Sequence, residues 1–130
     1  MSDYVLECLP PPWRWWAVRA FYLCLIVVLL LTLTPLQIPN NFPEEDKVHH
    51  LVAFGALAVL ACAAWPPQRW KVWLPLSALG AAIELIQIYV PNRSADVRDW
   101  AADTVGVILG WYVYPYCRRL FLMWFGRANS

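Results

Sequence analysis

A few polar residues interrupt otherwise apolar stretches of this 130-residue sequence, and their types could support proton transfer. Glu84 lies inside one such stretch, and Gln87 follows three residues later on the same helical face. An isolated carboxylate in hydrocarbon is costly, so it normally faces the interior of a bundle. Glu84 is therefore a candidate catalytic residue. The structural alternative is a protonated carboxyl that bonds a neighbouring helix.

Two i, i+4 pairs stand at the starts of other apolar stretches. Asp46 and His50 form one pair, with Lys47 beside them, and Asp99 and Asp103 form the other. Residues four apart share a helix face, so Asp46 could orient the His50 imidazole for proton transfer. Asp46 could instead be a helix N-cap, and His50 a hydrogen-bonding residue between helices. We take both as candidate catalytic residues.

Arg93 and Ser94 lie between Glu84 and the second pair. A guanidinium near headgroups suits bidentate phosphate binding, although an interfacial anchor is the simpler role. Ser94 stands in R-S-A-D rather than in a nucleophile elbow, so no nucleophile is evident. Asp96 is expected to cap the helix that follows. The predicted substrate-binding residues are Lys47, Gln87, Arg93, Ser94, Asp99 and Asp103.

The composition of the chain indicates whether these residues lie in a soluble protein or in a membrane protein. Hydrophobic residues make up 61% of the chain and charged residues only 15%, against roughly 25% charged in a soluble domain. The net charge of +1 gives no reason to expect nucleic acid as a partner. The sequence therefore predicts a membrane protein.

Four apolar stretches are each near the roughly 20 residues that a helix needs to cross a bilayer. The second is short and begins with His49 and His50, so a re-entrant or tilted segment is its alternative. The first could be a cleaved signal peptide, but the run is long and lacks an A-x-A site, which favours a retained anchor. We predict an all-α membrane protein whose four transmembrane helices span about 20–38, 48–65, 72–90 and 100–117.

Basic residues set the expected orientation, because Lys and Arg accumulate on the cytoplasmic side of short loops. We predict that both termini lie inside and that the polar residues form a pocket at the outer face. Residues 1–19 and 118–130 would be cytoplasmic segments flanking a membrane domain over 20–117. The basic residues expected inside are Arg14, Arg19, Arg69, Lys71, Arg118, Arg119 and Arg127.

The spacing of small and polar residues also bears on helix packing and metal binding. Gly106 and Gly110 form a small-xxx-small pattern that lets helix backbones approach closely. No cysteine pair indicates a disulfide or zinc site. Mg²⁺ or Mn²⁺ would suit a carboxylate-rich set, but no H-E-x-x-H or comparable spacing supports one, so no cofactor is expected. The residues that could supply such ligands are Asp46, His50, Glu84, Asp99 and Asp103.

These motifs together resemble the VanZ-like family, named for a protein associated with teicoplanin resistance. The resemblance covers residues 46–110 and rests on D-K-V-H-H, then E-L-I-Q, then R-S, and then D-x-x-G-x-x-x-G. Asp103 departs from the family pattern, which usually has Asn there, and adds charge. The resemblance implies a multi-pass protein of the bacterial cytoplasmic membrane with a role in the cell envelope.

Three functions fit these observations. The protein could be an enzyme that modifies an amphipathic substrate, such as a polyprenyl-phosphate-linked glycan or a phospholipid headgroup. It could bind a lipid-linked precursor or a lipophilic glycopeptide without turnover, which would link it to glycopeptide resistance. It could also be a non-catalytic subunit that works with partner membrane proteins. The sequence favours a lipid-linked or amphipathic ligand and leaves turnover against binding open.

Overall fold

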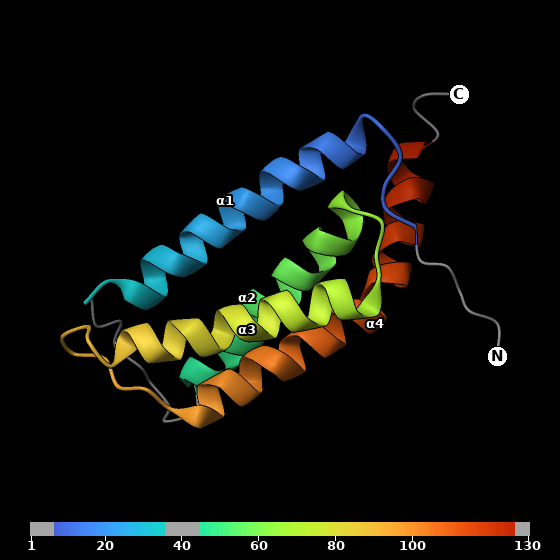
Figure 1. Cartoon of the computed structure of the whole chain (residues 1–130). Helices are drawn as coiled ribbons and strands as arrows, with labels where there is room; N and C mark the ends of the chain where they lie inside the picture. Colours follow the sequence, from blue (N-terminus) through green and yellow to red (C-terminus); the bar gives the residue numbers. More distant parts are fainter. Residues whose placement is uncertain (1–6, 36–44, 127–130) are drawn as a thin grey trace.

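The computed structural model describes residues 7–35 and 45–126, and these residues form four helices (Figure 1). The chain order is α1 (Trp13–Leu33), α2 (Glu45–Ala64), α3 (Arg69–Gln87) and α4 (Val97–Phe125). The predicted all-α class is confirmed. The second apolar stretch is one continuous helix. Of the residues used above, Arg127 and the end of the first predicted span at residues 36–38 lie outside the described part.

The helices alternate in direction, so their ends gather at two poles of the molecule. The carboxyl ends of α1 and α3 and the amino ends of α2 and α4 lie toward the left of Figure 1. The predicted polar residues belong to that pole. The far part of α4, drawn in red, turns away from the rest of the helix (Figure 1), and α4 contains Pro115 in its second half. Proline kinks a helix because it lacks the backbone N–H and clashes with the preceding turn.

Glycines bring α2 and α4 together, and this pair makes the most extensive helix contact. A Cβ added to Gly106 would collide with the backbone carbonyl of Leu51, and one added to Gly110 would collide with the carbonyl of Gly55. Both helices thus advance by four residues between the two contacts. The predicted packing role of Gly106 and Gly110 is confirmed. Phe54 of α2 is fully buried and belongs to the hydrophobic core.

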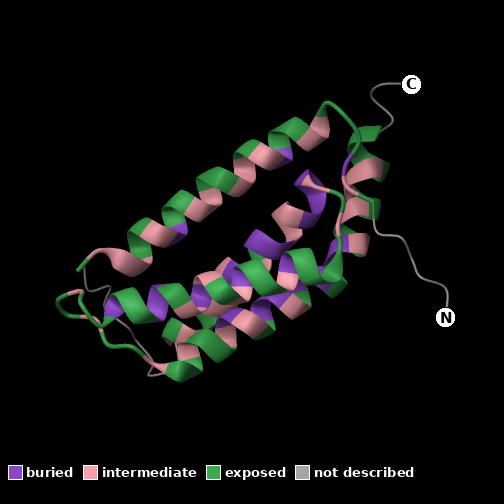
Figure 2. Cartoon of the chain, viewed as in Figure 1, coloured by how far each residue is buried: buried purple, intermediate pink, exposed green. Residues whose placement is uncertain are grey.

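Many large apolar residues are exposed, and exposed positions, drawn in green, recur along α1, α3 and α4 (Figure 2). On α1, Leu23, Ile26 and Leu30 are all more than half exposed. Such a surface suits a lipid environment, since soluble proteins rarely expose wide apolar patches. Within the described residues, α1 and α2 meet the length and apolarity that a membrane crossing requires.

The helix bounds differ most from the predicted spans at two ends. α1 begins at Trp13 rather than near Ala20, directly after Pro12, which occupies the N-cap position. α4 continues past Cys117 to Phe125. Both extensions are rich in aromatic and basic residues, which lower the mean apolarity without breaking a helix. A prediction based on apolar runs therefore stops short of them.

Candidate functional site

A polar cluster lies where α2, α3 and α4 meet at the pole described above. We define the carboxylate–histidine cluster as His50, Glu84, Asp99 and Asp103. The Nδ1 atom of His50 lies 2.7 Å from Oδ1 of Asp103, and its Nε2 atom lies 3.8 Å from Oδ2 of Asp99. Both ring nitrogens of α2's histidine thus face carboxylates of α4.

This cluster differs from a group of surface charges because its side chains are largely buried. Asp103 is fully buried, and Glu84 is 7% exposed. Gly80 makes the room for Asp103, because a Cβ added to Gly80 would lie 2.8 Å from Asp103 Oδ2. Glu84 is one helical turn further along the same face of α3 as Gly80. The cluster is therefore built into the packing between α3 and α4.

Glu84 is tied to the start of α4 through the backbone. Its Oε2 atom accepts a hydrogen bond from the backbone N–H of Asp96 at 2.9 Å. Asp96 is the N-cap of α4, and its Oδ1 atom accepts a hydrogen bond from the N–H of Arg98 at 2.9 Å. The predicted capping role of Asp96 is confirmed. One short segment thus positions both Glu84 and the two aspartates of α4.

Lys47 lies at the edge of the cluster and links it to the cap. Its Nζ atom is 3.6 Å from Oδ2 of Asp96 and 3.8 Å from Oδ1 of Asp99. Lysine and two α4 carboxylates therefore form an ion-pair network that remains partly open to the outside. Asp99 is the cluster carboxylate that Lys47 contacts.

The histidine's partner differs from the one that sequence spacing suggested. Asp46 lies exposed in the first turn of α2, where a carboxylate is favoured by the positive end of the helix dipole. Asp103, which we predicted as a substrate-binding residue, is the carboxylate bonded to the His50 ring. The buried aspartate is thus the group that orients the imidazole.

Gln87 and Arg93 lie apart from the cluster and bind the end of α1. Gln87 Nε2 donates to the carbonyl of Thr32 at 2.9 Å. Arg93 donates from Nη2 to the carbonyl of Leu31 at 2.8 Å and from Nε to that of Thr34 at 3.2 Å. The last carbonyls of a helix lack partners inside it, so these side chains satisfy them. Ser94 is exposed in the neighbouring connection.

Asp96 gives a pH-dependent prediction. Its pKa lies below the usual aspartate value, chiefly because its carboxylate accepts the Arg98 backbone N–H, with Lys47 as a further cause. A depressed pKa stabilises the fold above the unfolded pKa, and this contribution is lost as pH falls through the folded value. Asp96→Asn should keep the cap but flatten the acid limb of a thermal-unfolding pH profile below about pH 4. Asp96→Ala removes the cap too, so it should also lower the thermal stability at neutral pH.

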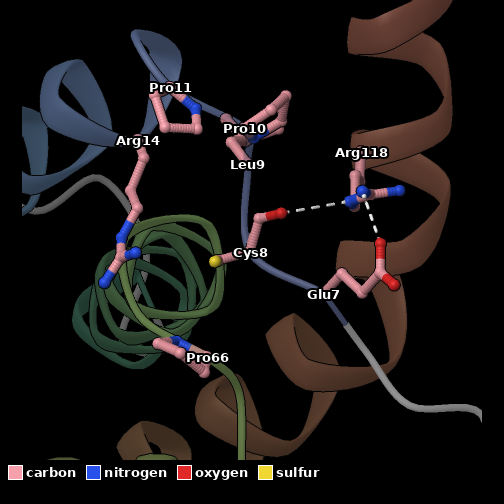
Figure 3. A pocket seen from close by; sticks show the side chains of 8 residues that line it. All are labelled: Glu7, Cys8, Leu9, Pro10, Pro11, Arg14, Pro66 and Arg118. Carbon is pink, nitrogen blue, oxygen red and sulfur yellow. Dashed lines mark hydrogen bonds and ion pairs between the residues drawn. The ribbon is translucent and has the colours of Figure 1, made fainter.

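A pocket of ≈ 400 Å³ lies away from the carboxylate–histidine cluster, at the amino-terminal segment (Figure 3). Arg118 bonds Glu7 and the carbonyl of Cys8 there, while Arg14 Nε donates to the carbonyl of Ala64. Both arginines thus fasten chain segments together. The lining residues are Glu7, Cys8, Leu9, Pro10, Pro11, Arg14, Pro66 and Arg118, none of which we predicted as a site residue.

Sequence reasoning missed two contributors to the cluster. One is Gly80, whose lack of a side chain admits Asp103; its place one turn before Glu84 was the available signal. The other is the backbone N–H of Asp96, which binds Glu84 and leaves no trace in residue types. The side chains of the cluster are thus brought together partly by contacts with the backbone.

Comparison with known proteins identifies one family. A family model described as VanZ/LLP1 matches residues 19–122, which is most of the chain. This match confirms the resemblance inferred from the motifs. No curated protein and no solved structure gave a significant match.

Proposed function

Because this chain belongs to the VanZ/LLP1 family, we propose that it acts in the bacterial cell envelope on a lipid-linked or amphipathic molecule. In this proposal all four helices cross the cytoplasmic membrane, with both termini inside. The carboxylate–histidine cluster then opens toward the outer leaflet. A lipid-linked precursor or a lipophilic glycopeptide as ligand would connect the protein to teicoplanin resistance.

The surface of the third and fourth helices supports the four-span topology. Leu74 and Leu85 on α3 and Leu109 on α4 are all close to or above half exposed, although water would not favour them there. Arg14 and Arg118 lie at the pole opposite the cluster. By the positive-inside rule, these basic residues support a cytoplasmic position for that pole.

The observation that carries the proposal is the hydrogen bond between His50 and the buried Asp103, beside Glu84. An imidazole oriented by a carboxylate can take a proton from a hydroxyl or water and return it to a leaving group. Asp103 would stabilise the imidazolium formed in that step. Glu84 would serve as the second proton-transfer group, and Lys47 would meet a phosphate at the open edge. This arrangement favours turnover over simple binding.

Native mass spectrometry of the full chain released from nanodiscs tests this function. We expect wild type to carry an anionic lipid or polyprenyl phosphate supplied in the nanodisc. Lys47→Ala and Arg93→Ala should each reduce that occupancy by about tenfold, a loss of about 1.4 kcal/mol in binding. Glu84→Gln should retain or accumulate the ligand, because it removes a proton-transfer group and keeps the volume.

Arg93→Lys provides a matched control for Arg93→Ala, since it retains a cation at the end of α1. Circular dichroism of each variant shows whether the helices remain folded. Loss of ligand in Arg93→Ala together with lost helicity would assign Arg93 to α1 alone. If no anionic lipid is retained by wild type or any variant, the lipid-ligand proposal is wrong and a protein partner becomes the better hypothesis.

A further inference from the structure

The carboxylate–histidine cluster has the geometry of a metal-ligand set. His50, Glu84 and Asp103 each offer one ligand atom, and these atoms lie within 4.8 Å of one another. Imidazole and carboxylate donors hold a divalent ion at about 2.0–2.2 Å, which places donor atoms up to about 4.4 Å apart. The spacing is thus close to that of a coordinated set. Each ligand comes from a different helix, so the site is fixed by the bundle.

Unsatisfied polar atoms give independent support for a missing cation. Oε1 of Glu84 and Oδ2 of Asp103 are buried, and neither has a hydrogen-bond partner among the described residues. A buried carboxylate oxygen without a partner is strongly unfavourable. Glu84 itself is more than nine-tenths buried. A bound cation would satisfy both oxygens, which the side chains of the described residues leave without a partner.

The charges around the cluster point the same way. Glu84, Asp99 and Asp103 are the acidic groups of the cluster, and among the described lysines and arginines Lys47 forms an ion pair with one of them, Asp99. Lys47 also contacts Asp96, so it is shared with a fourth carboxylate. Buried charges require pairing, and this excess of negative charge is concentrated around one imidazole. A divalent cation would remove the imbalance.

We propose that His50, Glu84 and Asp103 bind a divalent cation at the outer pole of the bundle, with Asp99 beside it. One imidazole with several carboxylates suits Mn²⁺ or a similar first-row ion better than Ca²⁺, which takes oxygen ligands alone. This proposal departs from our sequence expectation of no cofactor. Spacing along the chain gave no ligand motif, because the ligands meet only across three helices.

Metal binding is measured directly, without any lipid-linked ligand. The full chain in phosphatidylcholine nanodiscs is treated with a chelator, exchanged into clean buffer, and titrated with Mn²⁺ while electron paramagnetic resonance follows the free ion. We expect about one Mn²⁺ per chain in wild type. His50→Gln, Glu84→Gln and Asp103→Asn should each weaken binding by about tenfold or more. Mn²⁺ should also raise the unfolding temperature of wild type, because it binds the folded state.

His49→Gln is the matched control, since His49 neighbours His50 but is 56% exposed. It should bind Mn²⁺ as wild type does. Equal binding by wild type and Glu84→Gln would overturn the proposal, and so would failure of wild type to bind Mn²⁺ or Zn²⁺. A chain that binds Mn²⁺ but retains no lipid would keep this inference while removing the proposed function, so the two fail separately. Circular dichroism confirms that each variant is folded before titration.

Discussion

Replacing Gly106 by alanine is expected to destabilise the bundle by about 1–3 kcal/mol. The new Cβ would collide with the backbone carbonyl of Leu51, and a backbone atom cannot move aside by changing rotamer. α2 and α4 would have to separate along their most extensive contact. The free energy of unfolding, measured by SDS titration in mixed micelles, gives the cost. Gly106→Val should be worse, because its branched side chain needs still more room.

Gly126→Ala is the control for the Gly106 substitution. Among the described residues, a Cβ at Gly126 would meet Leu122 Cβ at 3.8 Å, which is an ordinary contact, and the backbone of Gly126 has a helical φ of −67°. We expect a change below about 0.5 kcal/mol. If Gly106→Ala were as mild as Gly126→Ala, the close approach of α2 to α4 would be wrong.

Separation of α2 from α4 would also change the geometry of the carboxylate–histidine cluster. Leu51, which touches Gly106, is next to His50, and Asp103 lies one turn before Gly106. The glycine contact therefore sets the distance between the imidazole and its carboxylate. Gly106→Ala should weaken metal binding in addition to lowering stability.

The helices were largely predictable from the sequence because each is an apolar run bounded by proline or charge. The Asp96 cap and the glycine stripe were also predictable, since both are local patterns on one helix. The aromatic start of α1 at Trp13 was not, because tryptophan and arginine alternate there with no apolar run to mark a helix. Such patterns give element types more surely than element ends.

The site was predictable as a set of residues but not as a set of contacts. The i, i+4 spacing correctly places Asp46 and His50 on one helix, yet the partner of His50 comes from α4. Which residues meet across two helices depends on the register in which they pack. That register is set by contacts such as Leu51 with Gly106, which involve backbone atoms. Arg93 shows the same limit, because its partners are carbonyls of α1.

Removing one member of the His50–Asp103 pair is expected to cost about 3–5 kcal/mol, the largest effect of any single side chain discussed. His50→Ala leaves a fully buried carboxylate without the partner that now lies 2.7 Å away. Asp103→Ala leaves the imidazole facing a cavity. A double-mutant cycle with both substitutions should show a coupling of about 1–3 kcal/mol, measured as unfolding free energies in the presence of a chelator.

The double-mutant cycle of His50 and Asp103 also distinguishes a purely structural pair from a pair of metal ligands. His49→Ala should change stability by less than about 1 kcal/mol, because its ion pair with Glu45 is exposed. A coupling near zero would show that His50 and Asp103 do not stabilise each other. If the addition of Mn²⁺ increases the coupling energy between His50 and Asp103, the two residues act through a shared cation. If Mn²⁺ leaves it unchanged, the hydrogen bond alone joins α2 to α4, and the imidazole is held for proton transfer without a metal.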